Sequence, residues 1–145
     1  MFTEKVTVRK LRPSEVNVKA VDDINYLLRR QHSKTRKVDK ESLLAHMKQS
    51  KVVVAWNDDD RIIALGVLVR TYALSHTFAG IHNLIIRNGF NPLSIGKRIV
   101  DLLIDEVDDV EFIETGVWPE NNDLINLLTV SGFVPKSKLR YRRKC

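Results

Sequence analysis

IHNLIIRNGFNPLSIGKRIVDLLIDEV, residues 81–107, contains a predicted strand, a turn and a helix in direct succession. Ile81–Ile86 has the apolar character of a buried strand, and the polar turn 87–90 follows it. A helix is predicted to begin at Asn91-Pro92, because Asn is a preferred N-cap and Pro suits the first helical position. The residue before Pro is also disfavoured in helical geometry, as an N-cap must be. Apolar side chains then recur at helical spacing, at Ile95, Ile99, Leu102 and Leu103.

A strand that leads into a helix through a short turn directs free backbone N–H groups at one point. The positive end of the helix dipole lies at the same point, so this arrangement binds anions, most often phosphate. The alternative is an ordinary capped helix that packs on the sheet.

The segment Ile86–Gly96 resembles the acyl-CoA-binding motif of the GNAT superfamily of N-acetyltransferases. That motif has a hydrophobic residue at the end of the fourth strand and, five residues later, the sequence Gln/Arg-x-x-Gly-x-Gly/Ala. Here Asn91 stands in place of Gln/Arg, Ser94 replaces the first glycine, and Gly96 matches the second.

A second block is similar to the family's Asn-x-x-Ala-x-x-Leu-Tyr-x-x-x-Gly-Phe, which follows a strand that ends in a hydrophobic residue. The matching positions here are Val117, Asn121, Leu124, Leu127, Leu128, Gly132 and Phe133. Two motifs in the family's order make this resemblance more specific than either motif alone.

The resemblance covers roughly the whole chain and implies one GNAT-like acyltransferase domain over residues 1–145. The implied fold is α/β, with a single mixed, mostly antiparallel sheet flanked by helices in the order β-α-α-β-β-β-α-β-α-β. The implied function is N-acetyltransferase activity, in which a primary amine directly attacks acetyl-CoA, the acyl donor. The alternative is a catalytically impaired domain that binds CoA, a protein or a nucleic acid.

The resemblance also implies which residues bind acetyl-CoA. In the family, backbone N–H groups of the loop and first helical turn hold the pyrophosphate. Asn91 marks the start of this turn, Pro92 has no N–H to donate, and Lys97 and Arg98 are expected to supply cations. The N–H groups expected to contribute belong to Leu93, Ser94, Ile95, Gly96 and Lys97.

Two further cofactor contacts are implied. In the family, the fourth strand pairs through its backbone with the pantetheine arm, which assigns Leu84, Ile85 and Ile86 here. Asn121 corresponds to the motif asparagine that contacts the cofactor arm, and it also suits a helix N-cap.

His82 is the candidate general base. Many family members have a Glu on this strand, four residues before its last hydrophobic residue, and His82 occupies that position. A histidine titrates near neutral pH, so it could remove a proton from the acceptor ammonium directly or through water. The alternative is a histidine of the core or sheet face that hydrogen-bonds to a neighbour.

The family's general acid is missing. The Tyr that commonly protonates the departing thiolate is Leu128 here, which carries no proton to give. Either another group or water protonates the thiolate, or the domain has lost activity.

The remaining sequence reads as alternating helices and strands without repeats or linkers. The expected elements are a strand around Val6–Val8, helices over 14–30 and after Asp39, a hairpin of strands 51–56 and 61–71, a strand over 110–117, a helix from Asn121 to Gly132, and one or two strands within 133–142.

The composition fits a soluble globular protein, with 43% hydrophobic and 29% charged residues. The longest apolar run, Ile62–Val69, is too short to span a bilayer, and the first eight residues show no signal-peptide pattern. Cys145 is the single cysteine, which excludes an internal disulfide or a cysteine metal cluster and suits the cytoplasm. We expect no metal site, since Asp58–Asp60 reads as a hairpin turn.

The net charge of +6 raises the chance of a polyanionic partner. No RNA-binding aromatic motif or zinc-finger spacing supports nucleic-acid binding as the main role. The basic loop residues Lys34, Arg36 and Lys37 would favour an acceptor with a carboxylate or phosphate if they faced the site, and are otherwise a solvated loop. Trp118 and Pro119 could line the acceptor pocket or fill a corner. Exposed edge strands make a homodimer reasonable.

Overall fold

The computed structural model describes residues 5–31, 37–72, 77–105, 107, 109–117, 121–137 and 140–144. The elements in chain order are β1 (Thr7–Lys10), η1 (Pro13–Glu15), α1 (Val18–Gln31), α2 (Lys40–Met47), β2 (Ser50–Trp56), β3 (Ile62–Tyr72), β4 (Thr77–Ile86), α3 (Pro92–Ile104), β5 (Phe112–Gly116), α4 (Asn122–Val130), β6 (Val134–Ser137) and β7 (Arg140–Lys144). This order is the predicted one, with two strands at its end.

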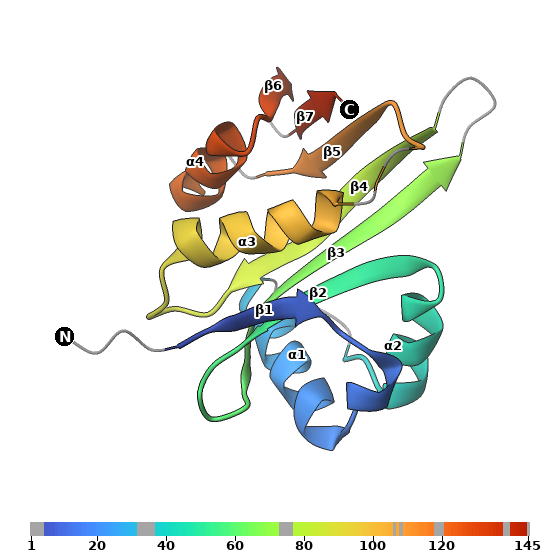
Figure 1. Ribbon diagram of the computed structural model, residues 1–145, viewed down its shortest axis with the longest axis vertical. Helices are drawn as coiled ribbons and strands as arrows, with labels where there is room; N and C mark the ends of the chain where they lie inside the picture. The colour runs from blue at the N-terminus through green and yellow to red at the C-terminus, as the bar shows by residue number, and fades with distance from the viewer. Residues whose placement is uncertain are drawn as a thin grey trace.

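The strands form a seven-stranded sheet in the order β1-β2-β3-β4-β5-β7-β6 (Figure 1). The neighbours β4 and β5 are parallel, and every other described pair is antiparallel. The prediction of a single mixed, mostly antiparallel sheet is therefore confirmed.

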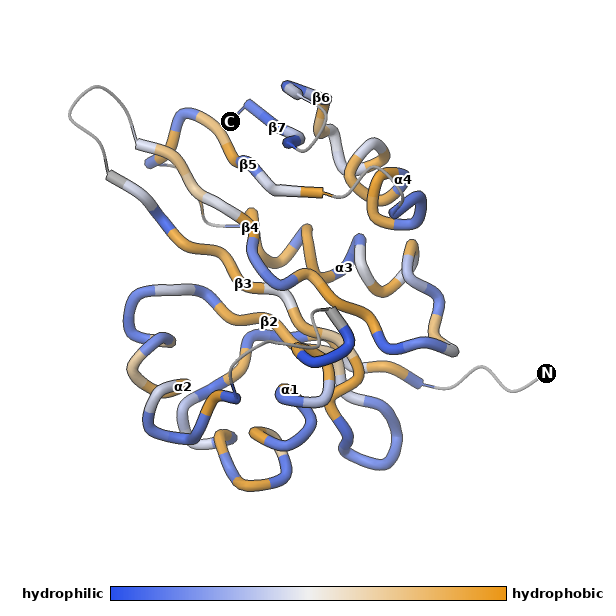
Figure 2. Tube along the Cα trace, turned by 180° about the vertical axis from the view of Figure 1, so that it is seen from behind, coloured by the Kyte–Doolittle hydropathy of each residue, from blue (hydrophilic) through white to orange (hydrophobic). Residues whose placement is uncertain are grey.

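Helices cover both faces of the sheet, and β2 shows the alternation that allows this. Val53 and Ala55 pack in the cluster with α3 and α4, whereas Val52 and Val54 pack in the cluster with α1 and α2. Figure 2 shows the hydrophobic colour running almost without a break along β2 and β3, as expected for strands buried on both faces. We refer below to the α1/α2 face and the α3/α4 face.

Side-chain caps begin three of the helices at the predicted residues. Asp39 accepts a hydrogen bond from the Ser42 amide, Asn91 caps α3 and Asn121 caps α4. These starts were readable because a cap acts within one helical turn of sequence.

Some boundaries differ from the predictions. The helix predicted from Ser14 begins at Val18, after the separate 3-10 turn η1. The central strand begins at Thr77 instead of Ile81, because its first residues pair with β3 on one side and β5 on the other. Pro135 lies within β6, where the edge position tolerates its missing N–H.

An irregularity in β4 was not predicted. Leu65 and Val67 of β3 lie opposite Ile85 and His82 of β4, so β4 carries one extra residue at this point. Asn83 lies in this bulge with φ +56°, a conformation that Asn tolerates better than most residues. Bulges bend a strand and often lie beside functional sites.

Candidate functional site

The parallel strands β4 and β5 pair only near their start. Phe78–Ile81 pairs with Phe112–Thr115, and β4 then continues to Ile86 with no described β5 residue opposite it. The Thr115 hydroxyl donates to the Ile81 carbonyl oxygen at 3.1 Å, at the last pair before the strands separate. Figure 1 shows the carboxyl ends of the two strands diverging, with α3 over the gap.

The open edge of β4 presents backbone hydrogen-bonding groups. The Arg87 N–H donates to the Ile63 carbonyl of β3 at 2.8 Å. Residues of an antiparallel strand alternate in the side to which their N–H and C=O groups point. The backbone groups of Ile86 and the carbonyl of Leu84 therefore point away from β3, toward the gap left by β5, and the N–H of Ile85 points toward β3.

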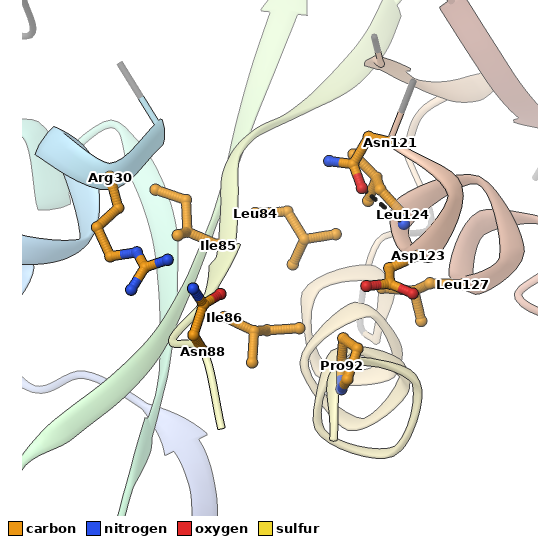
Figure 3. Close-up of a pocket in the computed structure, with 10 residues that line it drawn as sticks. All are labelled: Arg30, Leu84, Ile85, Ile86, Asn88, Pro92, Asn121, Asp123, Leu124 and Leu127. Carbon is orange, nitrogen blue, oxygen red and sulfur yellow. Dashed lines mark hydrogen bonds between the residues drawn. The ribbon is translucent and has the colours of Figure 1, made fainter. Parts of the chain in front are cut away.

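A cavity of about 260 Å³ occupies this gap. Figure 3 shows β4 in the middle, α4 on one side and α1 on the other. The lining residues are Arg30, Leu84, Ile85, Ile86, Asn88, Pro92, Asn121, Asp123, Leu124 and Leu127. The cavity thus brings together the predicted strand residues, the start of α3 and the predicted Asn121.

The start of α3 has fewer free amides than the sequence suggested. The Asn91 side chain accepts from the Ser94 N–H at 3.1 Å, and the Ile95 N–H donates to the Asn91 carbonyl at 3.1 Å. Gly96 and Lys97 lie deeper in the helix, where amides bond to the preceding turn. Of the five amides expected to bind the diphosphate, that of Leu93 is the one whose position leaves it without a partner in the helix or its cap. The expectation of five free donors is therefore too generous.

The two expected cations have other partners. Lys97 forms an ion pair with Asp101, one turn later, at 3.1 Å. The Arg98 guanidinium donates to the Val6 carbonyl at 3.2 Å. Both side chains are exposed, and exposed pairs are weak, so these contacts can be exchanged for contacts to an anion.

Gly96 is a packing residue in this structure. A Cβ at this position would lie 2.4 Å from Leu127 Cδ2 and 3.1 Å from Ile86 Cδ1. The missing side chain therefore lets α3 approach both α4 and β4, which sets the width of the cavity between them.

Asn121 both caps α4 and lines the cavity. Its Oδ1 accepts from the Leu124 N–H at 3.1 Å, which caps α4. Figure 3 shows its side-chain nitrogen pointing toward the cavity. The cap and a contact to a ligand carbonyl are therefore compatible.

His82 lies where β4 and β5 separate, one residue after the last pair. Its ring folds back over Gly80, since a Cβ on Gly80 would lie 2.9 Å from His82 Nε2. Partial desolvation of the imidazole, with a smaller contribution from the charge of His46, lowers the pKa of His82 below its ordinary value of 6.5. At pH 7 the ring is therefore neutral and able to accept a proton.

The position of the family tyrosine is closed to the cavity. Leu128 is fully buried among the core residues of the α3/α4 face. Tyr141 lies on β7 opposite Thr115, and Tyr26 lies on α1 with 43% of its surface exposed. No described tyrosine lines the cavity.

Three polar lining residues were missed by the sequence reading. Arg30 comes from α1, Asn88 from the loop after β4, and Asp123 from the first turn of α4. The basic residues in the last turn of α1 were visible in the sequence, but only the fold shows that one of them faces the cavity.

Several predicted features lie outside the described residues or carry no site. Lys34, Arg36, Trp118 and Pro119 are outside them, and Lys37 is exposed. Within the described ranges, no group of His, Cys, Asp and Glu side chains could hold a metal ion. No helix in the part of the chain that the structure describes is both long and apolar enough to cross a membrane.

Comparison with known proteins gives a likeness of structure. No model of a known protein family matches the chain, and no curated protein matches it in sequence. A GNAT-family acetyltransferase from Staphylococcus aureus superposes with a TM-score of 0.70 at 15% identity, over 97% of this chain and 99% of that chain.

Two further structures are similar over most of their length. A chain of the NatC complex, solved with Gag peptide and CoA, has a TM-score of 0.75 at 14% identity and covers 97% of this chain and 99% of that one. The ribosomal-protein-S5-alanine acetyltransferase from Vibrio fischeri has a TM-score of 0.71 at 16% identity and covers 99% of this chain and 95% of that one. These TM-scores establish a shared fold, and identities this low establish nothing beyond it.

Proposed function

We propose that this protein, which has the fold of the GNAT acetyltransferases, transfers an acetyl group from acetyl-CoA to a primary amine. The observation that carries the proposal is the gap between β4 and β5, with the Leu84 carbonyl and the backbone groups of Ile86 directed into it. A closed sheet would have no place for an extended acyl donor.

The residues around the gap suit acetyl-CoA. The pantetheine arm contains amide groups. The open edge of β4 offers these groups backbone donors and acceptors, as it would offer them to an added strand. Asn121 offers a side-chain N–H from the opposite wall. The start of α3 offers its dipole, the Leu93 amide and the Ser94 hydroxyl to the diphosphate. The solved NatC complex, which shares the fold, contains CoA.

In the proposed reaction the neutral amine attacks the thioester carbonyl, the N–C bond forms, and the C–S bond breaks. His82 accepts the proton that the ammonium must lose, directly or through one water, and its lowered pKa keeps it ready to do so. As the amide forms, the nitrogen loses its second proton to solvent, and the thiolate takes its proton from solvent, because Leu128 cannot supply one.

The rival function is a domain that binds CoA or another partner without catalysis. The buried Leu128 and the partly occupied amides of α3 motivate it. A transferase and a CoA-binding domain would both bind acetyl-CoA, but only the transferase would turn it over. The test therefore measures both binding and turnover.

Thermal unfolding tests binding. Acetyl-CoA at a hundred times its dissociation constant should stabilise the protein by about 2.7 kcal/mol. The absence of any shift at millimolar acetyl-CoA would remove the transferase and the CoA-binding form of the rival.

Thiol release from acetyl-CoA in the presence of a panel of amines then tests catalysis. We expect His82→Gln to lower turnover by about 10²–10⁴ while the acetyl-CoA-dependent thermal shift persists. Stabilisation without amine-dependent thiol release would favour the binding domain, and full turnover in the variant would eliminate His82 as the base.

A further inference from the structure

Beside the cavity, on the α1/α2 side of the sheet, three arginines gather around Tyr26 without a described acidic partner, and one of them, Arg30, lines the cavity. Arg30 lines the cavity from α1, and Arg87 follows β4 directly. The Arg87 guanidinium lies over the Tyr26 ring, 4.4 Å from its centroid. Arg61 lies near enough to act electrostatically on Tyr26. We call Arg30, Arg61 and Arg87, with Tyr26 between them, the arginine cluster.

Tyr26 organises the cluster. Residues 26 and 30 lie one turn apart on the same side of α1. A hydrogen bond from Arg30 to the Tyr26 hydroxyl, and then the charge of Arg87, lower the pKa of Tyr26. The Tyr26 ring thus contacts the Arg87 guanidinium directly, and Arg30 lies one helical turn away on the same side of α1, which places both arginines beside Tyr26.

The cluster lies on the other side of the sheet from the start of α3. The Ile85 side chain packs in the α1/α2 cluster, whereas Leu84 and Ile86 pack against the α3/α4 cluster. Arg87 continues the alternation on the side of Ile85, and its contact with Tyr26 of α1 agrees with this. An anion bound by the cluster is therefore a different group from the diphosphate at α3.

The charges of the cluster are not neutralised within the described residues. Arg30, Arg61 and Arg87 form no ion pair with any described carboxylate. Asp123 is the acidic residue among those lining the cavity, and Figure 3 shows it on the α4 wall, across the cavity from Arg30. Guanidinium groups bind carboxylates and phosphates with paired hydrogen bonds, so the cluster is ready to receive such a group.

We propose that Arg30, supported by Tyr26 and Arg87, selects amine acceptors that also carry a carboxylate or a phosphate. This inference rests on the proposed acetyl transfer and names its substrate class. His82 lies on the same α1/α2 side of β4, three residues before Ile85, so an acceptor that approaches from this side can meet His82 with its amine and Arg30 with its anion. Because of the bulge at Asn83, His82 and Ile85 lie opposite β3 residues that are two positions apart, a span of about 7 Å, which favours acceptors whose two groups are separated by several bonds.

The test compares matched acceptors in three proteins. The acceptor pairs are 4-aminobutyrate with 4-aminobutanol and phosphoethanolamine with ethanolamine. The proteins are the wild type, Arg30→Gln and the control Arg29→Gln, which removes the same charge from an exposed neighbour that does not line the cavity. We expect Arg30→Gln to lower the ratio of kcat/KM for the anionic over the neutral acceptor by about tenfold to a hundredfold, mainly through KM.

Three outcomes would overturn the proposal within an active transferase. The ratio could stay unchanged, or change equally in both variants, which would indicate general electrostatics. Alternatively, Arg30→Gln could raise KM for acetyl-CoA but not for its 3′-dephospho form, which would assign Arg30 to the remaining phosphate of the donor.

An experiment with inorganic phosphate separates failure of this inference from failure of the proposed function. Phosphate at constant ionic strength should stabilise the wild type and Arg29→Gln against heat more than Arg30→Gln. Equal stabilisation of all three proteins would refute the anion site, whether or not the protein proves to bind acetyl-CoA.

Discussion

His82 shows how a single residue acquires a chemical property from its surroundings. Gly80, two residues earlier on the same strand, leaves room for the imidazole to fold onto the sheet face, where it loses part of its hydration. The charge of His46, from α2, acts in the same direction. Both effects disfavour the protonated ring.

The lowered pKa of His82 should be visible in the pH dependence of acetyl transfer. Only neutral imidazole accepts a proton, and the lowered pKa of His82 leaves the ring mostly neutral at pH 6.5. The acid limb of kcat/KM should therefore have its midpoint below 6.5. His46→Gln removes one of the two causes, so it should move this limb upward. A limb that persists in His82→Gln would contradict the assignment.

Gly96 is a second residue at which the surroundings decide the effect of a single atom, here an added Cβ. An added Cβ would overlap the buried Leu127, and overpacking costs about 1–3 kcal/mol. Alanine returns up to about 1 kcal/mol through helix propensity. We expect Gly96→Ala to lower the free energy of unfolding in urea by about 1–2 kcal/mol. The exposed Ser94→Ala in the same helical turn should change it by less than about 0.5 kcal/mol, and equal effects would refute the packing role.

At the scale of elements, the start of α3 serves as a capped helix terminus and as the proposed diphosphate site. The two roles compete, because the Asn91 side chain occupies the Ser94 amide. A bound diphosphate must either replace this cap or use the neighbouring Leu93 amide.

Asn91→Asp separates the two roles. Asp caps helices as well as Asn does, so thermal unfolding without ligand should stay within about 0.5 kcal/mol of the wild type. The added negative charge should repel the diphosphate and weaken acetyl-CoA binding by about tenfold or more, measured by calorimetry. Unchanged affinity would mean that the diphosphate does not bind at α3.

At the scale of the whole molecule, two parts of the sheet are joined by only a short stretch of strand pairing. Strands β1–β4 and strands β5–β7 are joined by four residue pairs between β4 and β5, and by the packing of α3 on α4. A donor bound in the gap would replace the missing pairs and link the two parts.

Hydrogen exchange should detect this link. Acetyl-CoA should slow exchange of the Ile86 amide, which points into the gap, and of the Leu93 amide. Ile85, whose amide points toward β3, should already be protected. Slowing spread evenly over the chain would indicate general stabilisation without binding in the gap.

The predictions that held were those that depend on residues close in sequence. The caps at Asp39, Asn91 and Asn121 act within one turn, and strand alternation acts every second residue. The resemblance also predicted the fold, because its two motifs mark the two strand-to-helix connections around the gap.

The sequence by itself determined where α2, α3 and α4 begin, through the caps at Asp39, Asn91 and Asn121, and that α3 follows β4 after a short turn. Only the tertiary structure decided that β4 carries a bulge at Asn83, that the β4 edge stays open beyond Ile81, and that Arg30 faces the same cavity as Asn121. These features depend on contacts between residues far apart in the chain, where strand pairing and helix packing set geometry that no local pattern encodes.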